Sequence, residues 1–95
     1  MAEVRSRSDW TKEEKYWRDN YRQRPYVSPE QSYDSWGPAY RFGYDATDRY
    51  EGKSWNDVES DLRRDWDRYE HRGQSTWEQI KNGVRDAWDR VTGNR

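Results

Sequence analysis

Two similar stretches in the C-terminal half decide the fold: residues 54–69, SWNDVESDLRRDWDRY, and residues 76–91, TWEQIKNGVRDAWDRV. Both follow the pattern S/T-W-x2-V/I-x3-L/V-R-x2-W-D-R, and the second copy lies 22 residues after the first. Their tryptophans therefore recur every 11 residues, at Trp55, Trp66, Trp77 and Trp88. A repeat of this length indicates two copies of one structural unit.

Each copy has the hydrophobic pattern of an amphipathic helix. The apolar residues follow one another at steps of 3, 4, 4 and 3, which places them on one helical face. Opposite charges stand three or four positions apart on the other faces, as in Asp86 and Arg90. We expect helices over about residues 55–70 and 76–91. Their apolar stripes are Trp55, Val58, Leu62, Trp66 and Tyr69 in the first copy, and Trp77, Ile80, Val84, Trp88 and Val91 in the second.

The residues around each stripe predict where these helices begin and end. Ser54 with Asp57 and Thr76 with Gln79 have the spacing of capping boxes. Gly73 suits the position just after a helix C-terminus. The sequence therefore favours an antiparallel helical hairpin. The alternative is a single long helix carrying all four tryptophans, since residues repeated every 11 positions form a stripe that drifts in a right-handed sense along one helix.

A further helix is expected over about residues 37–50, where Trp36, Tyr40 and Tyr44 recur at steps of four. Pro38 suits the first turn of that helix. Gly43 in its interior costs roughly 1 kcal/mol relative to Ala, so a bent or broken helix is an alternative.

The N-terminal third predicts one more helix, over about residues 11–23. Thr11 with Glu14 resembles a capping box, Trp17 lies four residues before Tyr21, and Pro25 closes the element. Residues 1–10 are expected to be a frayed N-terminus, and residues 24–34 a linker. The predicted fold is a single all-α domain over residues 11–92. It is a small helical bundle, built on the C-terminal hairpin, with an aromatic-rich core.

Composition explains why the core must be aromatic. Hydrophobic residues make up 29% of the 95 residues and charged residues 39%, but there are seven Trp, eight Tyr and one Phe. Trp and Tyr keep a polar atom at one end, and they favour half-buried sites and interfaces. We therefore expect some aromatic stripes to be buried against a second copy of the chain or another protein. The predicted role is that of a non-enzymatic, self-associating protein.

Other functional classes find little support in the residues. The net charge is −1 without charged blocks, there is no Cys, and the only histidine, His71, falls in the turn between the repeats. We expect no catalytic residue, no metal site and no cofactor. No segment has the apolar length of a membrane span, and the N-terminus lacks the apolar region of a signal peptide, which predicts a cytoplasmic protein.

Two alternatives stay open. Arg outnumbers Lys by 14 to 4, and Arg stacks on aromatic faces, so an Arg/aromatic nucleic-acid-binding module is one alternative. Tryptophans also line sugar sites, so a small-ligand or carbohydrate-binding protein is the other.

Residues 36–93 resemble a group of small uncharacterised bacterial proteins. The resemblance rests on PAYRFGY at residues 38–44, Y-x-G-x2-W-x2-V-E at 50–59, Trp66, G-x2-T-W-E at 73–78 and V-R-x-A-W-D-R-V-x-G at 84–93. The group is found beside general stress proteins of the PRC-barrel and YsnF type, in bacteria such as cyanobacteria and Deinococcus. It implies a stress-associated role, and it brings no activity or catalytic residue with it.

Overall fold

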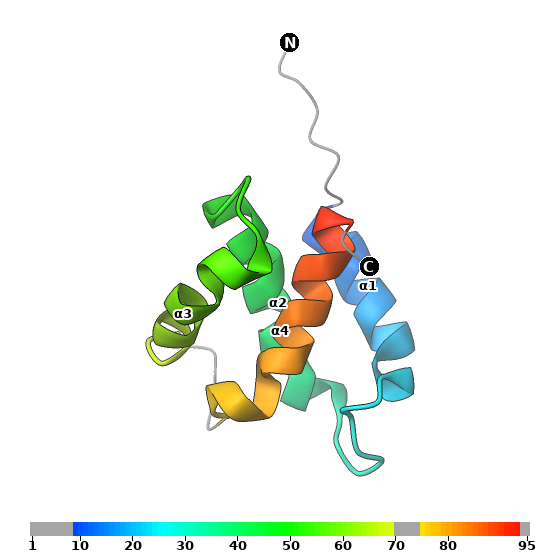
Figure 1. The fold of residues 1–95 in the computed structure, drawn as a ribbon. Helices are drawn as coiled ribbons and strands as arrows, with labels where there is room; N and C mark the ends of the chain where they lie inside the picture. The colour runs from blue at the N-terminus through cyan, green and yellow to red at the C-terminus, as the bar shows by residue number, and fades with distance from the viewer. Residues whose placement is uncertain (1–8, 70–74, 94–95) are drawn as a thin grey trace.

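The structure is a computed structural model that describes residues 9–69 and 75–93, and this part of the chain is all-α (Figure 1). This confirms the predicted small helical bundle with an aromatic core. Four α-helices and a short 3-10 turn are present among these residues: α1 (Trp10–Asn20), η1 (Tyr21–Gln23), α2 (Tyr33–Arg49), α3 (Trp55–Trp66) and α4 (Trp77–Thr92).

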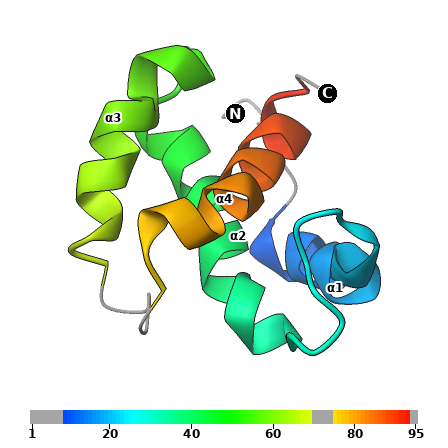
Figure 2. The same ribbon diagram turned by 60° about the horizontal axis from the view of Figure 1, so that its bottom comes forward.

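Helices α2 and α4 form the centre of the bundle, with α1 on one side and α3 on the other (Figures 1 and 2). Two glycines allow the central pair to approach closely. A β-carbon on Gly43 of α2 would collide with the Val84 carbonyl of α4, and one on Gly83 would lie 2.9 Å from the Trp36 ring. Gly43 therefore fits the close contact of α2 with α4, and α2 runs through it without a break.

The C-terminal hairpin is present, but it is not the main helix pair. Helix α3 meets α4 through Trp55, whose ring stacks on Trp77 at 6.3 Å and meets the edge of Trp88 at 6.1 Å between centroids. The contact of α4 with α2 is much more extensive. The expected pairing of the two repeats is therefore less extensive than the contact of α4 with α2.

The two helices of the N-terminal half begin earlier in the structure than expected. Helix α1 begins at Trp10, because Asp9 caps it by accepting a hydrogen bond from the Lys12 N–H at 3.3 Å, so the expected cap at Thr11 is not used. Helix α2 begins at Tyr33 rather than near residue 37. Residue 10 thus belongs to a helix rather than to a frayed end, and the linker is shorter than expected.

The position of Pro38 accounts for the error in α2. Pro38 lies inside the helix and not in its first turn. A residue before proline normally avoids helical geometry because its N–H and its Cβ meet the proline ring, and Gly37, which has no Cβ, avoids one of these two clashes. A β-carbon there would also lie only 2.8 Å from the Tyr33 ring. A glycine at this position therefore reduces the clash with Pro38 and leaves room for the Tyr33 ring.

The predicted ends of the repeat helices agree better with the structure. Ser54 and Asp57 form the capping box of α3, and the Gln79 side chain accepts from the Thr76 N–H at 3.0 Å at the start of α4. Helix α3 ends at Trp66, earlier than the expected residue 70. Gly73, His71 and residue 70 itself lie outside the described residues. At the end of α4, Gly93 adopts a left-handed conformation with φ of 79°.

The aromatic side chains fill the core of this bundle. Trp17 stacks face to face on Tyr40, with centroids 4.1 Å apart, and joins α1 to α2. Phe42 meets the edge of Trp66 at 5.2 Å and joins α2 to α3. The residues predicted for the stripes that are buried here are Trp17, Trp36, Tyr40, Tyr44, Trp55, Val58, Leu62, Trp66, Trp77, Ile80, Val84 and Trp88, whereas Tyr69 and Val91 are half-buried.

Candidate functional site

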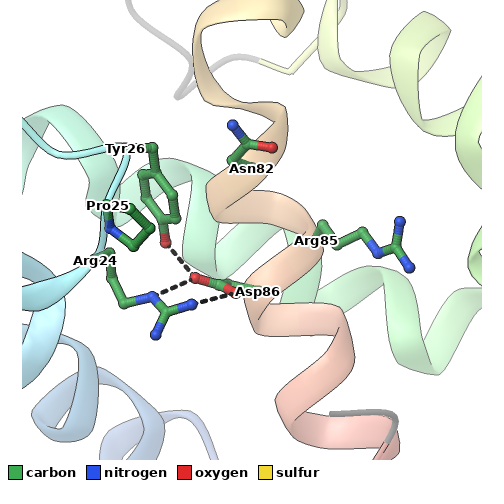
Figure 3. Close-up of a pocket in the computed structure, with 6 residues that line it drawn as sticks. All are labelled: Arg24, Pro25, Tyr26, Asn82, Arg85 and Asp86. Carbon is green, nitrogen blue, oxygen red and sulfur yellow. Dashed lines mark hydrogen bonds and ion pairs between the residues drawn. The ribbon is translucent and has the colours of Figure 1, made fainter.

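A dense polar cluster joins residues 24–26 to the middle of α4. Asp86 Oδ2 accepts hydrogen bonds from Arg24 Nε at 2.7 Å and from the Tyr26 hydroxyl at 2.6 Å (Figure 3). Asp86 Oδ1 accepts from Arg24 Nη2 at 3.0 Å. The Arg24 and Asp86 side chains are 30% and 15% exposed. Paired, charge-assisted bonds with this little exposure hold a fixed geometry.

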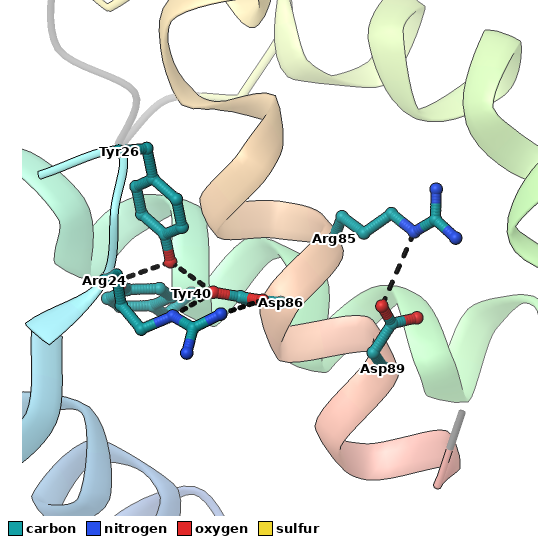
Figure 4. Close-up of polar contacts among 6 residues, drawn as sticks. All are labelled: Arg24, Tyr26, Tyr40, Arg85, Asp86 and Asp89. Atoms are coloured by element: carbon teal, nitrogen blue, oxygen red, sulfur yellow. Dashed lines mark hydrogen bonds and ion pairs between the residues drawn. The ribbon is translucent and has the colours of Figure 1, made fainter. Parts of the chain in front are cut away.

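Tyr40 extends this cluster into the core. The Tyr26 and Tyr40 hydroxyl oxygens lie 3.0 Å apart (Figure 4). A tyrosine has one hydroxyl proton, and Tyr26 donates its proton to the Asp86 carboxylate, which can only accept. Tyr40 is therefore the donor to Tyr26. The result is a directed chain of hydrogen bonds that runs from Tyr40 through Tyr26 to Asp86.

The local backbone explains why Arg24 and Tyr26 face the same way. The η1 turn ends before Arg24, whose φ and ψ of −79° and 140° are extended, as the residue before Pro25 favours. The turn at Pro25 and Tyr26 then brings the Arg24 and Tyr26 side chains to the same carboxylate. The N–H of Val27 then bonds the Arg24 carbonyl at 3.2 Å and closes the turn.

Burial fixes the protonation of both phenols. Burial, followed by the hydrogen bond to Asp86, raises the pKa of Tyr26 far above its ordinary value. Burial likewise raises the pKa of Tyr40. Both hydroxyl groups therefore keep their protons throughout the neutral range.

The cluster forms one wall of a shallow cleft of about 460 Å³, lined by Arg24, Pro25, Tyr26, Asn82, Arg85 and Asp86. Arg85 points away from the cluster and pairs with Asp89 at 3.5 Å (Figure 4). Its guanidinium also lies 5.4 Å from the Trp55 ring. The two arginines of the cleft do not converge on one point, so the cleft does not form a two-arginine anion site.

A second long-range ion pair fastens α1 to α4. Arg90 Nε donates to Glu13 Oε1 at 2.8 Å, and Glu13 is only 4% exposed. The Arg90 guanidinium also lies 3.5 Å from the centre of the Tyr16 ring, a cation–π geometry. Asp86 and Arg90, which the sequence suggested as partners, each pair instead with a residue from the N-terminal third.

The groove between α1 and α2 is a second candidate site, which we call the α1–α2 groove. It has a volume of about 470 Å³ and is lined by Trp10, Glu14, Arg18, Tyr33, Asp34, Gly37, Pro38, Arg41 and Tyr69. The Arg41 guanidinium lies 5.1 Å from the Trp10 ring, and that of Arg18 lies 4.3 Å from the Tyr33 ring. Half-exposed rings and both signs of charge therefore meet in one groove.

Tyr33 has an unusual environment at the end of this groove. Its hydroxyl is buried and has no hydrogen-bond partner among the described residues. Burial, with a smaller effect of the Glu14 charge, raises the pKa of Tyr33 to about 12.

The stripe residues predicted from the sequence do not gather at either candidate site. Trp36 and Trp66 satisfy their indole N–H groups inside the chain, on Gln31 Oε1 at 3.1 Å and on the Ser75 carbonyl at 3.0 Å. Of the predicted set, Tyr69 lines the α1–α2 groove and Tyr40 joins the Asp86 cluster. Arg24, Tyr26, Asp86, Glu13 and Arg90 were missed as site residues, because hydrophobic periodicity marks core positions and gives no signal for a partner 60 or more residues away.

Two absences can be stated for the described ranges. Residues 9–69 and 75–93 contain no group of three or more His, Asp or Glu side chains arranged to hold a metal ion. Within the same ranges, no helix has both the length and the apolar character needed to cross a membrane.

Comparison of the chain with protein-family models, curated proteins and solved structures found no match. The geometry of the molecule is therefore the basis for the proposals that follow.

Proposed function

We propose that this chain is a non-enzymatic protein that self-associates through the α1–α2 groove. The observation that carries the proposal is the make-up of the groove, where Trp10 and Tyr33 stand beside Arg18 and Arg41. Trp, Tyr and Arg are the residues enriched at the energetic centres of protein interfaces.

The charges of the groove favour a second copy of the chain as the partner. Arg18 and Arg41 are basic, and Glu14 and Asp34 are acidic, so the lining has no net charge. A two-fold symmetric interface places the same patch on both subunits and must be complementary to itself. A groove with both signs of charge meets that condition, whereas a groove of one sign would repel its copy.

The surface proposed here differs from the one suggested by the sequence. The tryptophans of the repeat stripes are buried within one chain, so their burial needs no second copy. Trp10, by contrast, is half-buried and lies in the groove. Self-association therefore rests on the groove and not on the stripes.

The tyrosine environments support a non-catalytic role. A general acid or base works best when its pKa lies near the working pH. The pKa values of Tyr26, Tyr33 and Tyr40 are all raised, and so are moved further from neutrality. These phenols are thus adapted to hold protons rather than to exchange them at neutral pH.

A concentration series by light scattering or sedimentation equilibrium tests the proposal. We expect the mean mass of the wild-type protein to rise with concentration, and Arg41→Glu to stay monomeric because it breaks the balance of charge in the groove. Arg63→Glu is the matched control, because it makes the same charge reversal at an exposed position of α3 outside the groove. A wild-type protein that is monomeric at every concentration would contradict the proposal, as would equal effects of the two variants.

A small-ligand or carbohydrate site is the second candidate, because one cleft suits it. This cleft, of about 380 Å³, is lined by Tyr26, Ser28, Gln31, Ser35, Trp36, Ser75, Gln79 and Ile80, which place hydroxyls and amides beside aromatic rings. Tryptophan fluorescence titrated with a sugar panel tests it, with Ser35→Arg as the variant that fills the cleft. The candidate predicts a saturable signal that this variant abolishes, and no signal from any sugar would reject it.

The biological setting is also a proposal. A stress-associated role in a bacterium rests on the resemblance of residues 36–93 alone, and a cytoplasmic location rests on the sequence pattern. Nucleic-acid binding remains a less favoured alternative, since Arg18 and Arg41 already pair with Glu14 at 3.1 Å and Asp45 at 3.2 Å. Titration with single-stranded DNA at low salt tests it, because phosphate contacts are strongest there.

A further inference from the structure

A continuous series of Trp and Tyr rings leads from the surface of α1 to the Asp86 cluster. Tyr16, which is half-buried, meets the edge of Trp17 at 4.9 Å between ring centroids. Trp17 stacks on Tyr40 at 4.1 Å, with only 11° between the ring planes. Tyr40 is hydrogen-bonded to Tyr26. Indole and phenol are the side chains most easily oxidised by one electron after thiols, and this chain has no Cys.

The far end of this series has a built-in proton acceptor. A phenol that loses an electron becomes strongly acidic, so its oxidation is favourable only where a nearby base takes the proton. Tyr40 donates to Tyr26 at 3.0 Å, and Tyr26 donates to Asp86 Oδ2 at 2.6 Å. Each proton therefore has an acceptor already in place, without movement of a side chain.

We propose that the Trp17–Tyr40–Tyr26–Asp86 series is a path for electron holes that ends in a proton-coupled tyrosine radical. The co-reactant is a diffusible one-electron oxidant strong enough to oxidise indole, such as the carbonate radical. This function is separate from self-association, since Trp17 and Tyr40 are both buried and neither lines the α1–α2 groove.

The step balances as one electron and one proton. The oxidant takes one electron and leaves the Trp17 radical cation, which takes an electron from the Tyr40–Tyr26 pair and returns to neutral indole. As that electron leaves, the hydroxyl proton of Tyr26 passes to Asp86 Oδ2. The unpaired electron then lies on the neutral Tyr26 phenoxyl group, or on that of Tyr40 once the Tyr40 hydroxyl proton has passed to Tyr26, and Asp86 is a carboxylic acid.

Three features of the site favour a tyrosine radical beside a protonated Asp86. The stacked Trp17 and Tyr40 rings are in van der Waals contact, which favours rapid electron exchange between them. The Arg24 guanidinium holds Asp86 in place through two hydrogen bonds. Tyr26 lines the open cleft, so a small reductant from solvent can return the electron while Asp86 returns the proton.

Photo-oxidation of the full chain tests the proposal. Ruthenium tris-bipyridine, excited by a flash and quenched by methyl viologen, serves as the one-electron oxidant. Transient absorption and freeze-quench electron paramagnetic resonance then distinguish tryptophan from tyrosine radicals. We expect the tryptophan radical of the wild-type protein to decay into a tyrosine radical, and that decay to slow severalfold in D2O because a proton moves with the electron.

Two variants locate the radical, and a third is the control. Tyr26→Phe removes the acceptor of Tyr40, and Asp86→Asn removes the final base, so each should lower the tyrosine radical yield severalfold while the tryptophan radical persists. Tyr50→Phe is the matched control, because Tyr50 donates to Asp65 at 3.0 Å in another tyrosine–carboxylate pair that lies outside the series. Circular dichroism at the same temperature establishes that each variant is folded.

The outcomes separate clearly. A tyrosine yield that falls in Tyr26→Phe but not in Tyr50→Phe supports the path. Equal yields in the wild type and Tyr26→Phe, or no isotope effect in the wild type, would overturn it, and the isotope measurement needs no variant. A monomeric protein that still passes these tests would separate this inference from self-association.

Discussion

At the scale of single residues, Asp86 shows how one side chain can join segments that are distant in sequence. Its carboxylate binds Arg24 and Tyr26 across 62 and 60 residues of sequence. It thereby attaches the linker to α4. The hydrophobic pattern alone gives no reason for the linker to pack there. Asp86 was expected to be a surface charge on a solvated helix face.

Asp86→Asn should destabilise the fold more than the loss of an ordinary surface ion pair. We expect a loss of about 2 kcal/mol in the free energy of unfolding, because the partly buried Arg24 guanidinium loses its charged hydrogen-bond partner. Asp19→Asn, which breaks an exposed pair with Lys15, should cost at most about 0.5 kcal/mol. Urea unfolding at neutral pH measures both, and equal losses would show that Asp86 is not a structural anchor.

Tyr33 predicts how stability depends on alkaline pH. Its pKa is about 12 in the folded chain, against an ordinary value of 10.0. Above pH 10 the unfolded chain gives up this proton first, so the free energy of unfolding should fall as pH rises from 10 to about 12. Tyr33→Phe should make that fall shallower, since the variant loses the Tyr33 contribution. Denaturant unfolding at a series of pH values tests this, and identical slopes would contradict it.

At the scale of helices, the sequence located the repeat units well and their packing less well. A 3.6-residue apolar period is a property of one helix, so α3, α4 and their N-terminal caps could be predicted locally. The start of α2 was misplaced because proline normally occupies the first turn of a helix, where it lacks no intrahelical hydrogen bond, whereas Pro38 lies further inside α2. The α2–α4 contact was not predicted, since Gly43 and Gly83 allow the two helices to approach and a glycine adds nothing to a hydrophobic pattern.

Gly43→Ala gives opposite predictions from helix propensity and from packing. Propensity alone predicts a gain of about 1 kcal/mol, because Ala is the better helix former. The structure predicts a loss of about 1–3 kcal/mol, because the new methyl group would collide with the Val84 backbone and force α2 and α4 apart.

Ser60→Ala, at an exposed position of α3, is the control and should be neutral or slightly stabilising. Thermal unfolding of both variants decides between the two views. A Gly43→Ala protein that melts higher than the wild type would mean that the central helices do not approach this closely.

At the scale of the whole molecule, stability depends on a few very large side chains. Trp17, Trp66 and Trp88 are each about 1% exposed, and there are few aliphatic residues to replace them. Truncating a buried Trp to Ala costs about 3–5 kcal/mol, whereas a typical small protein is stable by only 5–15 kcal/mol.

The double variant Trp66→Ala/Trp88→Ala should therefore be unfolded at room temperature. Trp10→Ala should stay folded, because Trp10 is only half-buried at the edge of the bundle. Near-ultraviolet circular dichroism measures the loss of fixed aromatic packing. A double variant that keeps the wild-type signal and size would refute the core assignment.

The ion pairs Arg24–Asp86 and Glu13–Arg90 join the linker after α1, and α1 itself, to α4 across 62 and 77 residues. During synthesis on the ribosome, α1 and its linker leave the exit tunnel long before the helix they bind has been translated. Helix α2 also lacks its main neighbour until that point. The bundle can therefore close only once α4 has been made, and until then the nascent chain exposes to chaperones the tryptophans that pack on α4, such as Trp36 and Trp55.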